Sequence, residues 1–204
     1  YTLDGAGALA VDYKLDISDR MPEPLRVGLQ TCVPNTLERI AYFGKGPQEN
    51  YSDRSCGAFL GLYRSTPEKF MHSYITPQEN GNRCDVRWLS LTASDGRGVQ
   101  FVGAEPLSVS VWNCTQESLD KARHSNEVEP LADALTVNID RTQTGVGGTD
   151  TWSLKARPSD QSRLPAERRL RAPAANSCRA PHAIPASLQP TMQGRHLFIL
   201  TSKS

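Results

Sequence analysis

Apolar and polar residues alternate with a period of two along most of the chain up to Asp140. Clear runs of this kind cover residues 8–17, 25–33, 86–91, 98–113 and 134–140. Gly, Pro, Asn and Asp separate the runs, and we expect residues 98–113 to form two strands. Side chains of a β-strand point alternately to the two faces of its sheet, so this pattern is typical of antiparallel strands joined by turns. The sequence therefore predicts an all-β, mostly antiparallel fold.

Residues 115–125 (TQESLDKARHS) interrupt the alternation. The segment opens with Thr115, places Gln116 and Glu117 in its first turn, and is rich in helix-forming residues. A threonine at this position favours a helix start, because its side chain accepts a hydrogen bond from the first turn. We therefore expect one short helix.

The composition changes after Leu154. Residues 155–196 contain six prolines and eight basic residues in 42 positions, without a helical or strand period. Such a segment buries too little apolar surface to offset the entropy lost on ordering it. We therefore expect a folded domain over residues 1–157 and a largely disordered tail over residues 158–204. Within that tail, residues 197–200 could pair as an edge strand.

The net charge of +1 hides an uneven distribution. Residues 1–154 hold 14 Lys and Arg against 20 Asp and Glu, a net of −6, whereas residues 155–204 hold 9 against 2, a net of +7. An acidic body without a basic stripe argues against a nucleic-acid partner. No run of about 18 apolar residues is present, which argues against a membrane span. The chain starts at Tyr1 without a methionine or a signal-peptide pattern, so we expect part of a longer protein.

The cysteines Cys32, Cys56, Cys84, Cys114 and Cys178 are widely spaced and form no C-x-x-C pair. Disulfide frameworks and zinc sites use closer or paired spacing. We expect free, mostly buried thiols, which favour a reducing compartment and hence a cytoplasmic location. The four histidines show no metal-binding spacing such as H-x-x-x-H, so we assign no metal ligand.

The tetrapeptide Pro-Gln-Glu-Asn occurs twice, at residues 47–50 and 77–80. The sequences around the two copies differ, which argues against an internal repeat. Proline presets φ and asparagine tolerates a positive φ, so each copy is typical of an exposed turn.

Four longer strings occur in a fixed order: YFGKGPQENYSDR, GLYRS, YITPQENGNRCDVRWLSL and TGVGGTDTWS. Together they resemble the C-terminal small-chain domain of bacterial β-galactosidases in glycoside hydrolase family 2, over residues 1–157. The resemblance implies a β-supersandwich similar to galactose mutarotase, packed beside a catalytic (β/α)₈ barrel. That barrel would belong to the same chain or to a separate large chain, in an enzyme that forms a homo-oligomer. The implied activity is retaining hydrolysis of terminal β-D-galactosides.

The resemblance also implies a sugar contact. The loop GVGGTDTW ends in Trp152, which matches a tryptophan that lines the sugar pocket of the whole enzyme. An indole ring packs well on the C–H face of a sugar, and Gly147 and Gly148 allow a close approach of the backbone. We expect Trp88 and Trp112, which lie on strand patterns, to be core residues instead.

The two tetrapeptides supply weaker candidates for sugar binding: Glu49, Asn50, Glu79, Asn80 and Arg83. We expect their carboxylates to accept turn N–H groups or to pair with Arg54 and Arg83. The resemblance places the catalytic carboxylate pair on the barrel, so we assign no catalytic residue and expect no activity from this chain alone. Magnesium and sodium are used by the resembled enzymes, but we expect no cofactor within this chain.

Two other functions are compatible with the sequence. A free-standing carbohydrate-binding module would use a sheet face and the two tetrapeptide loops. An epimerase like mutarotase would need a general acid and base, for which His72 with Glu79 is the candidate pair. A shared fold alone is a weak argument for that activity.

Overall fold

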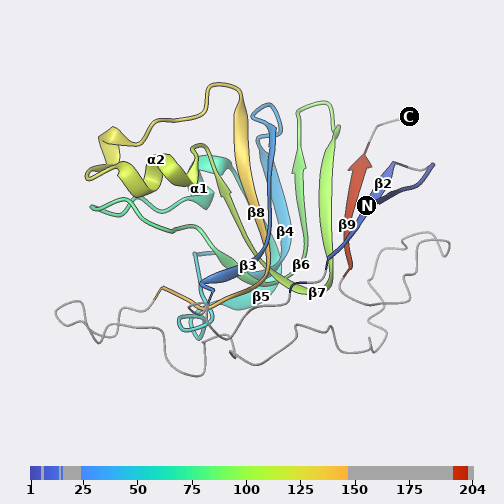
Figure 1. Cartoon of the computed structure of the whole chain (residues 1–204), viewed down its shortest axis with the longest axis horizontal. Helices are drawn as coiled ribbons and strands as arrows, with labels where there is room; N and C mark the ends of the chain where they lie inside the picture. The colour runs from blue at the N-terminus through green and yellow to red at the C-terminus, as the bar shows by residue number, and fades with distance from the viewer. Residues whose placement is uncertain (6, 14, 16–23, 147–194, 202–204) are drawn as a thin grey trace.

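The computed structural model describes residues 1–5, 7–13, 15, 24–146 and 195–201 of the 204 (Figure 1). The strands are β1 (Thr2–Leu3), β2 (Ala8–Asp12), β3 (Arg26–Pro34), β4 (Arg39–Gly46), β5 (Phe59–Ser65), β6 (Arg83–Thr92), β7 (Gly98–Trp112), β8 (Ala134–Gln143) and β9 (Arg195–Thr201). Two short helices, α1 (Pro67–Phe70) and α2 (Gln116–Lys121), and a 3₁₀ turn at Ser125–Glu127 complete the fold. Every strand pairing is antiparallel, which confirms the all-β prediction.

The strands form one sheet in the order β1-β2-β9-β7-β6-β4-β5, and β8 and β3 branch from β7. One edge of β7 pairs with β6, and the other pairs with β9 through residues 98–103 and with β8 through residues 108–112. Pro106, which has no backbone N–H, lies between the two partner segments. The expectation of two strands over residues 98–113 is therefore wrong, because the ladder with β6 holds them as one strand that changes its partner.

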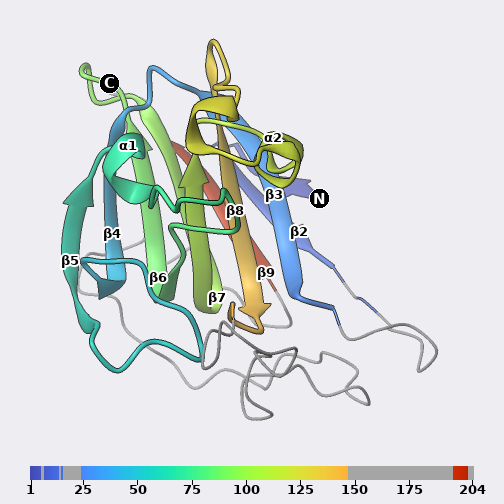
Figure 2. The ribbon, with the colours of Figure 1, turned by 90° about the vertical axis from the view of Figure 1, so that its left-hand side faces the viewer.

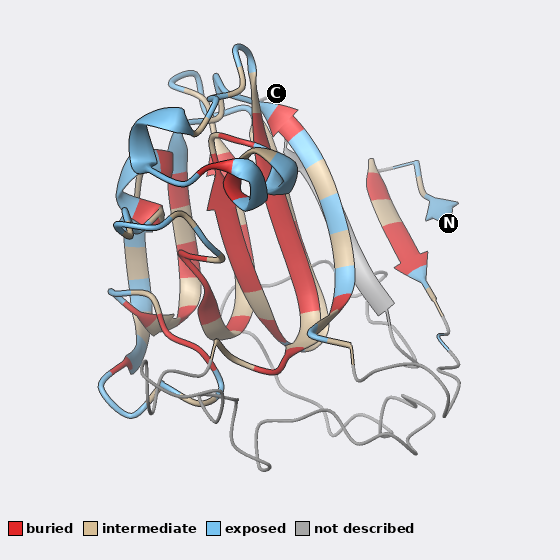
Figure 3. Ribbon diagram, turned by 60° about the vertical axis from the view of Figure 1, so that its left-hand side comes forward, coloured by how far each residue is buried: buried red, intermediate tan, exposed pale blue. Residues whose placement is uncertain are grey.

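The main core lies on one face of the sheet, where the interior strands carry buried side chains (Figure 3). Its largest members are Ile40, Tyr42, Phe70, Leu89, Leu91, Phe101, Leu107 and Ile139. Helices α1 and α2 lie over this face (Figure 2). A second, smaller cluster joins Trp112 to Leu119 of α2. The two helices therefore form a partial second layer over the apolar face of the sheet.

The two strand tryptophans differ in burial. Trp112 is fully buried, as expected, whereas Trp88 is only half-buried. The register of β6 shifts twice before Trp88, and Asp85 within the first shift has a φ of 55°. Such bulges change which residues point inward, so Val86 and Leu89 are buried instead. The expectation of a core role for Trp88 is therefore wrong.

Helix α2 confirms the predicted helix. The Thr115 hydroxyl accepts a hydrogen bond from the Ser118 N–H at 3.1 Å, and Lys121 pairs with Glu117 at 2.6 Å. The sequence pattern did not indicate α1, a single turn that begins with Pro67. It also did not indicate β4 and β5. Strand β5 lies at an edge of the sheet, and its residue Phe59 is 73% exposed.

Strand β9 (Arg195–Thr201) lies within the predicted tail. It pairs with β2 on one side and with β7 on the other. The predicted strand over residues 197–200 is thus present, but its predicted edge position is wrong. Residues 158–194 lie outside the described residues, so the disordered tail and the boundary at residue 157 stay predictions.

All four described cysteines are free thiols, as expected. Cys114 is buried and Cys84 is half-buried, but Cys32 and Cys56 are exposed. The expectation of mostly buried thiols is wrong for these two. Cys32 faces outward on β3, which pairs only with β8 in the described part of the chain, and Cys56 lies in the loop between β4 and β5. Among the described residues, no helix is long and apolar enough to cross a membrane.

Candidate functional site

The two Pro-Gln-Glu-Asn segments form the same local structure. The Asn50 side-chain amide donates to the Gln48 carbonyl at 3.0 Å, and the Asn80 amide donates to the Gln78 carbonyl at 2.9 Å. Each asparagine therefore closes its own turn through a bond to the residue two positions earlier. This agrees with turn chemistry as the cause of the repeated letters.

Both asparagines also anchor a distant backbone group. Asn50 Oδ1 accepts the Cys84 N–H at 2.9 Å, and Asn80 Oδ1 accepts the His72 N–H at 3.1 Å. The two side chains are almost completely buried. Their hydrogen-bonding groups are thus used within the protein, where they hold the loops in place.

The two loops interlock. The Asn50 N–H donates to the Asn82 carbonyl and the Asn82 side-chain amide donates to the Asn50 carbonyl, both at 2.8 Å. Glu49 of the first loop accepts the Gly81 N–H of the second at 2.8 Å. Residues far apart in the sequence therefore form one unit, which we call the paired loops (residues 46–58 and 71–82).

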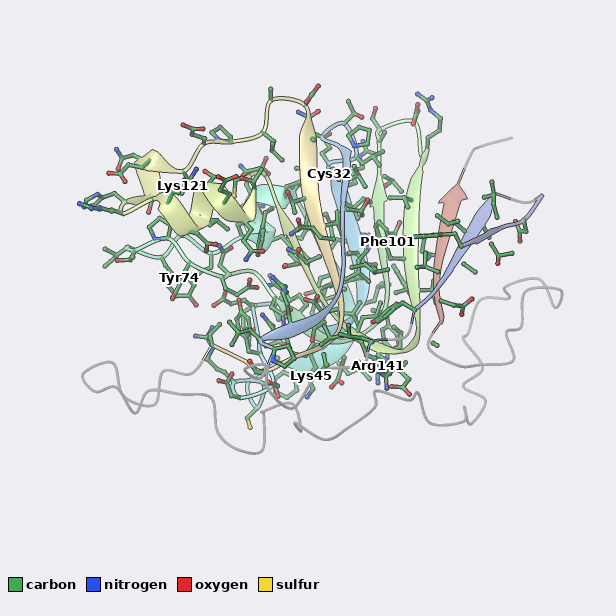
Figure 4. The ribbon with its side chains drawn as sticks, viewed as in Figure 1. Cys32, Lys45, Tyr74, Phe101, Lys121 and Arg141 are labelled. Atoms are coloured by element: carbon green, nitrogen blue, oxygen red, sulfur yellow. The ribbon has the colours of Figure 1, made fainter. Side chains whose placement is uncertain are left out.

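Glu49 is fully engaged within the paired loops. Its Oε1 atom pairs with Arg54 at 2.6 Å and also accepts the hydroxyl of Tyr74. This confirms the predicted pairing of Glu49 with Arg54. Burial and the bond to Glu49 raise the pKa of Tyr74, so its hydroxyl remains a donor. Figure 4 shows Tyr74 near α2, away from Lys45 and Arg141 at the lower end of the sheet.

Arg83 occupies the centre of the paired loops and is only 3% exposed. Its guanidinium donates to one phenol and three carbonyls, namely Tyr42 Oη (3.2 Å), Pro47 O (3.1 Å), Gly81 O (3.0 Å) and Asn82 O (3.2 Å). It also lies 4.4 Å from the centre of the Phe70 ring. The expected pairing of Arg83 with a tetrapeptide carboxylate is wrong, because backbone carbonyls hold this charge instead.

Glu79 pairs with Arg26 rather than with Arg83. Arg26 NH1 lies 3.0 Å from Glu79, while its Nε and NH2 atoms bind one oxygen of Asp140 at 3.0 and 2.7 Å. Burial raises the pKa of Glu79 to about 7 despite the nearby Arg26, and it also raises the pKa of Asp140. One guanidinium thus bridges two carboxyl groups, and Glu79 exchanges a proton near neutral pH.

Two further side chains, those of Gln143 and Tyr51, lie beside this bridge. Gln143 is the cross-strand partner of Arg26, and Tyr51 is fully buried. Burial, followed by the charges of Glu79 and Glu49, raises the pKa of Tyr51. Within the described residues, Tyr51 Oη, Glu79 Oε1 and Gln143 Oε1 are buried without a hydrogen-bond partner.

The first of the paired loops contacts the start of the glycine-rich segment. Ser52 Oγ donates to the Gln143 carbonyl at 3.1 Å, and the Asp53 carboxylate packs against Gly145, which has a φ of 90°. The strongest sequence candidates, Gly147, Gly148 and Trp152, lie outside the described residues. The structure therefore shows the stem of the predicted sugar-binding loop but not its tip.

The alternative site is not assembled in the described residues. The side chain of His72 is exposed and its ring contacts Tyr74, with 4.4 Å between ring centres. Glu79 is held by Arg26 instead. Among the described residues, no group of three or more His, Cys, Asp or Glu side chains is arranged to hold a metal ion.

Sequence reasoning missed Arg26, Tyr51, Asp53, Asp140 and Gln143. Only Asp140 could have been noticed in the sequence, because it is a charged residue at the end of an alternating run. The structure shows that its side chain is buried. Arg26 and Gln143 meet through the pairing of β3 with β8, which joins residues more than 100 positions apart, whereas Tyr51 and Asp53 lie in the first of the paired loops.

Comparison with known proteins gives a consistent picture. A sequence model of the family described as "Beta galactosidase small chain" matches residues 1–172. The chain is 33% identical over 159 residues to a β-galactosidase of Priestia megaterium, and 35% identical over 158 residues to one of Vibrio cholerae. It is 37% identical over 159 residues to β-galactosidase 2 of Enterobacter cloacae. Each alignment covers 78% of this chain but only 15% of the relative.

Proposed function

Because this chain belongs to the β-galactosidase small chain family, we propose that it completes the sugar site of a larger, retaining β-galactosidase that hydrolyses terminal β-D-galactosides. The aligned part makes up only 15% of the length of these relatives, so most of the enzyme would lie elsewhere. This chain would pack against a catalytic barrel, in the same polypeptide or in a separate large chain. A cytoplasmic location is part of the same proposal.

One observation carries the proposal. The paired loops, which contain the Pro-Gln-Glu-Asn parts of two of the family-like strings, lie against the stem of a third, the glycine-rich segment that begins at Gly145. Strings that are separate in the sequence therefore meet at one end of the sheet. Such convergence of family-like segments is expected of a functional site.

We propose that Asn50, Asn80 and Arg83 support the site and do not contact the sugar. Each is almost completely buried, and its side chain forms at least one hydrogen bond to the paired loops. Glu79 keeps 25% of its side chain exposed and is the better candidate for a direct sugar contact.

The described carboxylates do not favour catalysis by this chain alone. A retaining glycosidase needs two carboxyl groups about 5 Å apart that are free to attack and to transfer a proton. Glu79 and Asp140 come together only through Arg26, and Asp140 is buried. We therefore propose that the catalytic pair lies in the rest of the enzyme.

Trp152 provides the test. In the complete enzyme, Trp152→Ala should weaken galactoside binding by on the order of 1–3 kcal/mol, or roughly 5- to 150-fold, through lost burial and stacking. Trp152→Phe should recover part of the loss, because it keeps a flat apolar face. Covalent trapping of the nucleophile should persist at saturating sugar, since the carboxylates are unchanged.

The opposite pattern would refute the proposed role of Trp152. If it is a core residue, the alanine variant loses several kcal/mol of stability while the folded fraction binds galactoside normally. Thermal midpoint and galactoside affinity, measured on the same variant, separate the two outcomes.

A carbohydrate-binding module is the second candidate, and one feature favours it. Leu62, Phe43, Trp88 and Val102 are successive cross-strand partners on β5, β4, β6 and β7. They form an apolar row on the outer face of the sheet, where none is fully buried. Aromatic side chains on a sheet face are a suitable surface for sugar rings.

A further inference from the structure

Strand β5 (Phe59–Ser65) forms one edge of the sheet (Figure 2). In the described part of the chain it pairs only with β4, and the register of this pairing has no shift. Its sequence, FLGLYRS, contains no proline, and Arg64 is its one charged residue. Proteins commonly protect an edge strand with prolines, charges or a bulge, because its free N–H and C=O groups can pair with another strand. Strand β5 has little of this protection.

The side chains of β5 are apolar on both faces of the sheet. Leu60 and Leu62 are 51% and 59% exposed, and Leu62 is the cross-strand partner of Phe43 on the outer face. Because side chains alternate along a strand, Phe59 and Tyr63 lie on the other face. Tyr63 packs there against the main core, whereas Phe59 is strongly exposed. Clustered, exposed apolar side chains of this kind are typical of a protein–protein interface.

These side chains are arranged symmetrically about Gly61. An aromatic residue and a leucine precede this glycine, and a leucine and an aromatic residue follow it, in the order Phe59-Leu60-Gly61-Leu62-Tyr63. When two such strands pair antiparallel with Gly61 opposite Gly61, Leu60 faces Leu62 of the second copy and Phe59 faces its Tyr63. Residues directly opposite each other lie on the same face of a sheet, so every apolar side chain meets another one. A two-fold interface requires this self-complementarity.

We propose that two copies of this chain form a dimer by antiparallel pairing of their β5 strands, centred on Gly61, which joins the two sheets into one. The flanking positions fit this register, because Arg64 faces the uncharged Ala58 of the second copy and no like charges are opposed. The apolar row that ends at Leu62 continues onto Leu60 of the second copy. The dimer does not depend on the proposed role in the sugar site.

Sedimentation velocity of the 204-residue chain at several concentrations measures the association. One pair of edge strands is smaller than a standard interface, so we expect a dissociation constant on the order of 1–100 µM. Leu62→Glu places a carboxylate opposite Leu60 of the second copy, twice in the dimer, and should weaken association roughly tenfold or more. Leu60→Glu should act in the same way by symmetry. Leu25→Glu is the matched control, because Leu25 is 72% exposed but lies outside β5, and it should leave the dimer intact.

A charge pair tests the register. Leu60→Lys combined with Leu62→Glu places a lysine opposite a glutamate at two positions, and should restore most of the association that Leu62→Glu removes. If Leu62 faced Leu62 instead, the two introduced glutamates would repel each other and nothing would be restored. Absence of this recovery, or a dimer unaffected by both single glutamate variants, would overturn the proposal. Thermal midpoints close to that of the unmodified chain verify that the variants are folded.

Another part of the larger enzyme is the alternative occupant of this edge. In that case the 204-residue chain stays monomeric even at about 1 mM. Amide exchange of residues 59–65 would then slow in the complete enzyme and not with the concentration of this chain. Either result would overturn the dimer, whereas slower exchange at higher concentration of the chain supports it.

Discussion

Glu79 is a carboxyl group whose pKa lies near neutral pH. Its pKa is raised to about 7 because burial disfavours the carboxylate more than Arg26 favours it. In the unfolded chain its pKa returns to the ordinary value of 4.5. Between these values the folded protein binds more protons than the unfolded one. The stabilisation is therefore fully present below the unfolded pKa and is lost as the pH rises through about 7.

We predict that the free energy of unfolding of the 204-residue chain falls between about pH 5 and pH 8, by on the order of 2 kcal/mol. Glu79→Gln cannot ionise and should flatten this dependence. Urea unfolding at the two pH values measures the effect. An equally steep dependence in Glu79→Gln would assign it to another group, of which Asp140, with its raised pKa, is the first to examine.

At the scale of elements, β9 is the strand whose position depends most on contacts distant in the sequence. It supplies the hydrogen bonds for β2 and for residues 98–103 of β7. Strand β2 otherwise pairs only with β1, which is two residues long. Two strands alone are marginally stable in water, so the N-terminal pair relies on β9 to stay on the sheet.

We predict that deleting residues 195–204 exposes β2 and the first part of β7. Amide hydrogen exchange should accelerate in residues 8–12 and 98–103, while residues 108–112, which pair with β8, keep their protection. Mass spectrometry of the exchanged peptides measures both segments in one experiment. Unchanged exchange in residues 98–103 would contradict the pairing with β9.

At the scale of the whole molecule, the described part has carboxyl groups held in structural bonds and an apolar row on its outer face. We predict that the isolated chain does not hydrolyse a chromogenic β-galactoside. Turnover that disappears in Glu49→Gln or Glu79→Gln would disprove this.

Binding of a galactoside by the isolated chain, lost in Trp88→Ala but kept in Gly57→Ala, would favour the carbohydrate-binding module instead.

The sequence by itself determined the local features of this protein. The alternation in residues 134–140, the Thr115 helix start and the asparagine-closed turns depend on neighbours a few positions away, so they are visible in short windows. The tertiary structure alone decided which distant groups meet. Bulges in β6 place Trp88 on the outer face of the sheet, β9 lies between β2 and β7, and Glu79 pairs with Arg26. Strand register and partner choice depend on long-range hydrogen bonding and packing, which no local pattern specifies.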